Sequence, residues 1–183
     1  MDSIATALIM AASSAVNNIP FPADTLKNAD LEELYQLAAV HQMTALAAEA
    51  LNRTGIRDDR FSGERIKAIS IACQYDIERQ RILNELEHSQ IWYLPLKGII
   101  LQDYYPQPGL RQMCDNDILF DASRADDVRK IMESCGYKTI RFGKLHQDDY
   151  QKEPFLHLKC IGNYSVLCQM KNCPVTIRMR KGS

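Results

Sequence analysis

The chain has 183 residues, of which 46% are hydrophobic and 25% are charged. This composition excludes wholesale disorder and predicts one substantial domain, or a small domain with a helical appendage. Because 22 basic residues nearly balance 23 acidic ones, the sequence predicts no general affinity for nucleic acid, although a local basic pocket remains compatible with it.

The sequence also predicts a cytoplasmic protein that does not enter a membrane. Ile4–Val16 is apolar, but Asp2 precedes it and no basic segment does, so it differs from a secretory signal. No stretch reaches the roughly 18–20 apolar residues of a membrane span. No pair among the six cysteines has the Cys-x-x-Cys spacing of a zinc site. A secreted disulfide scaffold would be shorter and richer in cysteine, which favours reduced thiols in the cytoplasm.

Residues 1–89 predict a helical region. A first helix covers Met1–Asn17, and Asp30 is the expected N-cap of a second helix whose apolar spacing continues to Leu51. A long third helix is expected from Ser62 to His88. Its apolar face is expected to carry Ile66, Ile69, Cys73, Ile77 and Leu83 to Leu86.

In residues 90–158 the hydrophobic period changes from that of helices to that of short strands separated by turns. The predicted elements are a strand Ile91–Leu96, a helix Ile99–Tyr104, a strand Asp117–Phe120, a helix from Ser123 as its N-cap to about Cys135, and a strand Tyr137–Phe142. We assign His146 and Asp148-Asp149 to a polar loop. This order predicts an α+β fold, with the N-terminal helices followed by a small mixed-sheet α/β core.

Lys97-Gly98 lies at the predicted strand-to-helix turn. A glycine there lets the backbone approach a ligand, and the N–H groups that begin a helix attract anions. Lys97 adds a positive charge suited to a polyphosphate. On its own, a Lys-Gly pair usually marks no more than the start of a helix.

Asp115 and Asp117 alternate along a predicted extended segment, so their carboxylates point to the same side. Two such carboxylates repel each other unless a cation lies between them, and Mg²⁺ is the usual one. A pair of Mg²⁺ ions can activate an attacking hydroxyl group and stabilise a leaving pyrophosphate. A lone Asp-x-Asp is more often a solvated turn, and Arg111 alone would be a surface charge. Their order, with Asp117 leading into an apolar strand, favours a functional site.

Four segments together resemble the family of uncharacterised nucleotidyltransferases, within the DNA polymerase β-like superfamily. They are Leu96-Lys97-Gly98, Tyr105-Pro106, Leu110-Arg111 and Asp115–Leu119. The resemblance covers about Leu26 to Leu158. It implies catalytic metal ligands at Asp115 and Asp117, a Lys97-Gly98 turn in place of the Gly-Ser turn of better-known relatives, and a phosphate contact at Arg111. It further implies an NTP substrate, two Mg²⁺ ions and a hydroxyl acceptor in a protein, a nucleic acid or a small molecule.

The end of the chain departs from this family. The family is expected to carry Glu-x-His on a later strand, but no acidic residue follows Glu153. Residues 159–183 contain three cysteines and resemble coding sequence read in the wrong frame. Restoring one base after the codon of His157 lets the same bases encode Glu-x-His. We therefore expect a frameshifted or truncated chain, with domains at 1–89 and 90–158, an aberrant tail at 159–183, and a core that is incomplete at its C-terminus.

Two function classes follow from these observations. The intact aspartate pair favours an enzyme that transfers a nucleotidyl group from an NTP in a Mg²⁺-dependent reaction. Lys159, at the position where an acidic residue is expected, favours an inactive form that binds nucleotide or a protein partner. Turnover of labelled NTP distinguishes the two classes.

Overall fold

The computed structural model describes residues 3–22, 24–25, 30–96, 98–112, 116–143, 147–154 and 156–162. The chain forms two compact units, each made of two segments: Met1–Gln74 with Leu101–Met113, and Tyr75–Ile100 with Cys114–Ser183. The sequence-based division into 1–89, 90–158 and 159–183 places its boundaries elsewhere. The fold class is α+β as predicted, because helices come first and a five-stranded mixed sheet follows.

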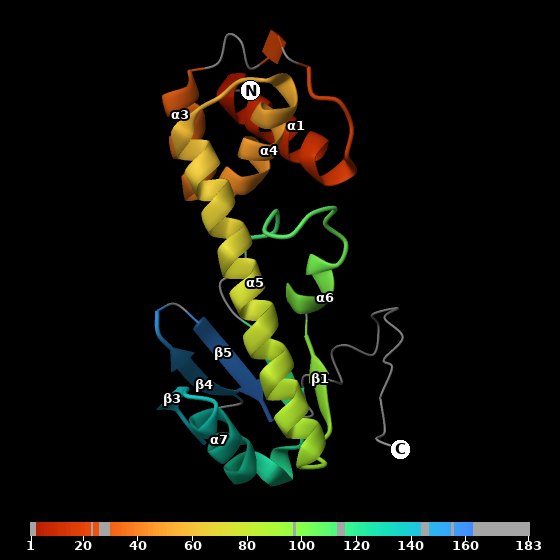
Figure 1. Ribbon diagram of the computed structural model, residues 1–183, viewed down its shortest axis with the longest axis vertical. Coiled ribbons are helices and arrows are strands. Elements are labelled where there is room, and N and C mark those ends of the chain that lie inside the picture. Colours follow the sequence, from red (N-terminus) through yellow and green to blue (C-terminus); the bar gives the residue numbers. More distant parts are fainter. Residues whose placement is uncertain are drawn as a thin grey trace. The chain divides into compact units, whose positions relative to one another are not determined.

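The first unit is a cluster of helices around a core of leucine and alanine side chains (Figure 1). Its helices are α1 (Ser3–Asn17), α3 (Leu31–Val40), α4 (Thr44–Thr54) and the first part of α5 (Asp59–His88). Each helix contributes a large buried side chain, namely Leu8, Leu34, Leu51 and Phe61. Burial of each such side chain contributes about 1.5–3 kcal/mol to stability.

The N-cap predicted at Asp30 is confirmed. Its carboxylate accepts hydrogen bonds from the backbone N–H groups of Glu32 at 2.8 Å and Glu33 at 3.3 Å. These N–H groups have no partner within the helix, so the aspartate satisfies donors that begin α3.

The prediction of one continuous helix from residue 31 to residue 51 is wrong. α3 ends at Val40 and α4 begins at Thr44, and between them Gln42 has a left-handed backbone with φ of 54°. Gln112 holds the start of α4, because its side-chain oxygen accepts from the Thr44 hydroxyl at 3.1 Å and from the Ala45 N–H at 3.4 Å. A tertiary hydrogen bond thus supplies the N-terminal partner that no local residue provides.

The buried face of α5 differs in part from the predicted one, because Leu86 is buried as expected but the residues predicted before it are not. Ile66 and Ile77 are 69% and 67% exposed, and Cys73 is exposed as well. The buried positions recur at helical spacing on another face of the helix and are Phe61, Arg65, Ala68, Ala72, Tyr75, Ile82 and Leu86. The apolar spacing of the isoleucines therefore does not mark the side of α5 that packs.

The second unit contains the sheet, with strand order β1-β2-β5-β4-β3. β2 and β5 are parallel, whereas the other neighbouring pairs are antiparallel. The strands are β1 (Tyr93–Pro95), β2 (Asn116–Phe120), β3 (Lys138–Arg141), β4 (Gln147–Lys152) and β5 (Leu156–Ile161). The sequence does not predict β4 or β5. The polar loop assigned to Asp148-Asp149 is in fact strand β4, and His146, assigned to the same loop, lies outside the described residues. β5 continues to Ile161, past the residue 158 at which the predicted core ends.

The two faces of this sheet differ in composition. Ile118, Tyr150 and Leu158 lie on one face and are almost fully buried. The second part of α5 packs near that face, because the Tyr75 hydroxyl accepts a hydrogen bond from the backbone N–H of His157 at 3.3 Å. On the other face Asp117, Asp149 and Lys159 are partly buried, whereas Leu119 is 2% exposed.

The helix predicted after β2 is present, but its cap is not Ser123. Asp121 accepts hydrogen bonds from the backbone N–H of Ser123 at 3.0 Å and from its hydroxyl at 2.7 Å, and this forms a 3-10 turn over Ala122–Arg124. α7 (Ala125–Ser134) then follows. None of the helices in the described residues has the length and apolar character that a membrane crossing requires.

Candidate functional site

Asp117 is held on β2, the strand between β1 and β5. The next three residues of the strand, Ile118, Leu119 and Phe120, are at most 2% exposed. Their burial anchors β2 in the core. The backbone position of Asp117 is therefore fixed on both sides, and its side chain lies on the less buried face of the sheet.

Gly98 lies next to this strand because of one backbone hydrogen bond. Leu96 follows β1, and its N–H donates to the carbonyl oxygen of Asp117 at 2.9 Å. Gly98 then begins the short helix α6 (Gly98–Gln102), in which Ile99 is 9% exposed and donates its N–H to the Leu96 carbonyl at 3.2 Å. Two predicted site residues, Gly98 and Asp117, thus belong to one unit. Lys97 and Asp115 lie outside the described residues.

Arg111, the third predicted nucleotide-binding residue, belongs to the first unit and is half-buried. It lies in a loop whose neighbouring positions are fixed. Leu110 is 1% exposed and packs against Ala15 and Leu46, while Gln112 holds the start of α4. The backbone on either side of Arg111 is therefore constrained, which is the support that a binding arginine requires.

A buried arginine holds the loop that leads to Arg111. Arg65 of α5 donates to the Pro108 carbonyl at 2.8 Å and to the side-chain oxygen of Gln107 at 2.9 Å. Gln107 in turn donates to Glu49 of α4 at 3.0 Å, and the Arg65 guanidinium is 3.8 Å from the same carboxylate. Burial lowers the pKa of Arg65, although an arginine stays charged at neutral pH. The Glu49 carboxylate provides the opposite charge that a buried guanidinium needs.

Lys159 is the nearest cross-strand neighbour of Asp117 on β5, since the two residues are register partners. On the other side of Lys159, Asp149 of β4 is its partner, and Asp149 is in turn paired with Arg141 of β3. Directly opposed residues in a sheet point to the same face. An acidic and a basic residue therefore alternate across four strands. Sequence reasoning noted Lys159 only as a departure from an expected acid, assigned Asp149 to a polar loop in preference to a position facing the site, and missed Arg141.

Asp148 points to the opposite, buried face and is 7% exposed. It accepts a hydrogen bond from the Gly143 N–H at 2.8 Å. Burial raises the pKa of Asp148, the Gly143 hydrogen bond lowers it, and the charge of Asp149 raises it. This carboxylate faces the core, so it does not belong to the charged row that contains Asp117.

The described residues do not fit a pair of magnesium ions. Within them, no three His, Cys, Asp or Glu side chains lie close enough together to hold a metal. Asp117 offers one carboxylate, but its neighbour on β5 is the cationic Lys159. Asp115, two positions earlier, is the second ligand that the sequence predicts for one ion, and it lies outside the described part of the chain.

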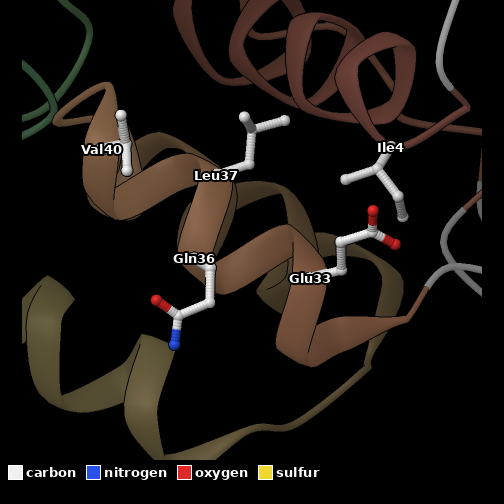
Figure 2. Close-up of a pocket in the computed structure, with 5 residues that line it drawn as sticks. All are labelled: Ile4, Glu33, Gln36, Leu37 and Val40. Carbon is white, nitrogen blue, oxygen red and sulfur yellow. The ribbon is translucent and has the colours of Figure 1, made fainter.

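A surface hollow of about 280 Å³ lies in the first unit, and no predicted site residue is part of its lining. Figure 2 shows Ile4 of α1 beside α3, from which Glu33, Gln36, Leu37 and Val40 complete the lining. The hollow is shallow, because Val40 at its edge is 76% exposed. With one carboxylate and no basic side chain in its lining, it does not have the chemistry of a phosphate site.

Comparison with known families gives one match. The family model described as uncharacterised nucleotidyltransferase matches residues 27–172, most of the chain. This range includes every predicted site residue and extends past Leu158 into the first part of the predicted tail. No curated protein and no solved structure matches the chain.

Proposed function

The chain belongs to the uncharacterised nucleotidyltransferase family, and from this premise we propose that it binds an NTP and transfers the nucleotidyl group to a hydroxyl group of an acceptor. The observation that carries the proposal is the hydrogen bond between Leu96 and Asp117. It joins the turn that begins at Gly98, a proposed phosphate contact, to the strand that bears a proposed catalytic carboxylate. Protein, nucleic acid and small-molecule acceptors all fit the proposal.

Each proposed site residue has a specific role. Lys97 and Arg111 supply positive charge to the phosphates, and Gly98 leaves room for them at the backbone. Asp115 and Asp117 are the proposed catalytic residues and the ligands of one Mg²⁺. When bound, Mg²⁺ supplies positive charge that assists the attacking hydroxyl and the leaving pyrophosphate. We also propose a cytoplasmic location, because a secreted disulfide scaffold would be shorter and richer in cysteine than this chain of 183 residues with six cysteines.

A second candidate function has its own observation. Lys159, opposite Asp117, brings an ammonium group to the strand next to the proposed metal ligand. Like charges disfavour one another, so this neighbour opposes the binding of a divalent ion. The alternative is therefore a catalytically inactive module that holds a nucleotide or a protein partner.

The deciding experiment incubates the chain with Mg²⁺ and each labelled NTP, and follows label transfer and pyrophosphate release. Asp115→Asn and Asp117→Asn test the proposed ligands. Asp126→Asn, at an exposed position on α7, is the matched control. Nucleotide binding is measured in parallel by equilibrium dialysis.

Transfer that persists in Asp126→Asn and disappears in the other two variants supports the enzyme. Nucleotide binding without transfer supports the inactive module. If the chain neither binds nor transfers any NTP, the nucleotide function is excluded for this chain and the family membership stands without it.

A further inference from the structure

Helix α5 carries an exposed apolar stripe on the side away from the residues that pack. Ile66 and Ile77 are 69% and 67% exposed, Ile69 is 37% exposed, and Cys73 is exposed as well. With 3.6 residues per turn, these four side chains fall within about 80° of one another around the helix. Single exposed apolar residues are ordinary, but several that form one stripe mark a surface that binds another apolar surface.

The stripe is symmetric about Cys73. Ile69 and Ile77 lie four residues before and after it, and Ile66 and Gln80 lie seven residues before and after it. Residues at these spacings share one face of a helix. Read from either end, the stripe keeps the same order, except that Gln80 takes the place of Ile66. A self-complementary surface of this kind is what an interface between two copies related by a two-fold axis requires.

The charges beside the stripe also favour a second copy as the partner. The stripe itself contains no charged side chain, so two copies bring no like charges together there. Lys67, next to it, has its ammonium group 3.4 Å from Glu64, and Arg79 is 2.5 Å from Asp76, so these charges are paired along α5 itself. A strongly charged partner would need opposite charges along the stripe, and an apolar copy needs none.

We propose that this stripe is the interface of a dimer in which the α5 helices of two copies pack in opposite directions about a two-fold axis at Cys73. Ile69 of one copy then packs against Ile77 of the other, and the two Cys73 side chains meet at the centre. The proposal goes beyond nucleotidyl transfer and does not depend on it.

The size of the stripe predicts a weak and reversible dimer. From Ile66 to Gln80 the stripe is about 21 Å long and one helix, about 10 Å, wide. Stable interfaces bury about 800 Å² on each partner, which is much more than this stripe offers. At the centre, helices whose axes are about 8–10 Å apart place facing α-carbons about 4–5 Å from each other, close to the separation at which two cysteines form a disulfide.

The test is sedimentation equilibrium of the full chain in a reducing buffer, at chain concentrations from about 10 to about 500 µM. It compares the unaltered chain with Ile77→Lys. Ile140→Lys is the matched control, because Ile140 is 60% exposed and lies on β3, outside the stripe. Circular dichroism verifies that each variant is folded.

We expect the unaltered chain and Ile140→Lys to dimerise with a Kd of about 10–300 µM. Ile77→Lys should weaken the dimer at least about tenfold, because it brings two ammonium groups into an apolar interface. A chain that stays monomeric at about 500 µM would overturn the proposal and leave the stripe to a different partner. Equal weakening in Ile77→Lys and Ile140→Lys would overturn it as well.

Oxidation with diamide is a second measurement that leaves the isoleucines unchanged. Diamide takes up one hydrogen from each of two thiols, which then form a disulfide. Cys135 and Cys160 are buried, whereas Cys73 is exposed. A covalent dimer should therefore form in the unaltered chain, decrease strongly in Ile77→Lys and disappear in Cys73→Ser. A covalent dimer that forms equally in Cys73→Ser, or none at a concentration at which the chain is dimeric, would overturn the arrangement about Cys73.

Discussion

The backbone N–H of Leu96 donates to the carbonyl oxygen of Asp117 at 2.9 Å, which ties the start of α6 to strand β2. The Leu96 side chain is 2% exposed, so the residue that donates this bond is anchored in the core. Because the bond joins backbone atoms, it sets the distance between the turn and the strand whatever side chains they carry. The geometry of the candidate site therefore depends on the packing of Leu96.

Leu96→Ala tests this dependence. The cavity should lower the free energy of unfolding by about 2–5 kcal/mol and loosen the turn at Gly98, so nucleotide binding should weaken. Leu86→Ala is the matched control, since Leu86 is 1% exposed on α5 within the same unit and should cost a similar amount of stability. Nucleotide affinity is measured at a temperature at which both variants are folded. Equal loss of affinity in both variants would show that the effect is general destabilisation.

Gly109→Ala should destabilise the first unit. Gly109 has φ of 75°, and an added Cβ would lie 2.7 Å from the carbonyl carbon of Ala68 and from the backbone nitrogen of Ile69. Both the backbone strain and the contact with α5 oppose the substitution, so a loss of about 2–4 kcal/mol is expected. Urea unfolding measures the loss.

The control for this substitution is Gly63→Ala, also on the first unit. No atom lies within 4 Å of a Cβ at Gly63, and the residue is inside helix α5. Alanine should therefore stabilise the helix by about 0.5–1 kcal/mol. The free energy of unfolding should therefore fall in Gly109→Ala and rise in Gly63→Ala. A fall in both variants would contradict the prediction.

Arg65→Met should destabilise the first unit by about 3 kcal/mol, because it leaves Glu49 without its buried positive partner and Pro108 without a donor. Lys67→Met is the control, since Lys67 is 64% exposed and 3.4 Å from Glu64, and it should change stability by less than about 1 kcal/mol. Thermal unfolding compares the two variants. A neutral Arg65→Met would mean that the network around Glu49 does not hold the loop.

This same residue explains why the buried face of α5 could not be predicted. Apolar spacing favours the face with Ile66 and Ile77, yet the face that packs contains Arg65 and small alanines. Burial of Arg65 becomes favourable only through Glu49, Gln107 and Pro108, which are distant in the sequence. Periodicity detects apolar stripes, but it does not detect the ion pair that allows a stripe containing an arginine to be the buried one.

Some strands of the sheet could be predicted from the sequence and others could not. Ile118-Leu119-Phe120 is a short apolar run of the kind that predicts a buried strand, and β2 is where the sequence indicates. β4 contains Gln147-Asp148-Asp149 and has little apolar alternation, so nothing local marks it as a strand. β5 does alternate, with Leu156, Leu158 and Cys160 buried, and this signal was available. β5 was not predicted, because residues 159–183 were assigned to an aberrant tail and only the first half of the alternating pattern precedes residue 159.

Only those residues of the candidate site that belong to local sequence patterns could be predicted. The order of Gly98 and Asp117 around an apolar strand indicated the site, and the two residues lie in one unit. The partners of Lys159 depend on the register between β2, β5 and β4, which is set by long-range pairing. No local pattern predicts such a register when two of the three strands are themselves missed.

Asp148→Asn should make stability less dependent on pH. The folded-state pKa of Asp148 is raised above 3.8, mainly by burial, so the folded chain retains this proton to higher pH than the unfolded chain does. Stability consequently falls as pH rises from 3.8 through the folded-state pKa, and it stays reduced above it. Asparagine keeps an oxygen for the Gly143 N–H and carries no charge. The variant should melt at a higher temperature than the unaltered chain at pH 7 and show no such gain at pH 3.

The control for this pH prediction is Asp126→Asn, an exposed acid on α7, for which the melting curves at both pH values should match those of the unaltered chain. A gain of equal size at pH 3 and pH 7 in Asp148→Asn would indicate better packing by the amide. In that case the charge of Asp148 would not be the cause.

The last prediction concerns Asn116, where one substitution is expected to raise the free energy of unfolding and can also lower nucleotide binding or transfer. It is 1% exposed, directly before Asp117, and within the described residues its side-chain oxygen has no hydrogen-bond partner. A buried unsatisfied oxygen costs about 1–3 kcal/mol, so Asn116→Leu should raise the free energy of unfolding by an amount of that order. The exposed Asn84→Leu is the control and should have little effect. If the Asn116 amide serves the neighbouring site, the more stable variant should bind or transfer nucleotide less well. A variant that is more stable and equally active would assign no role to this amide.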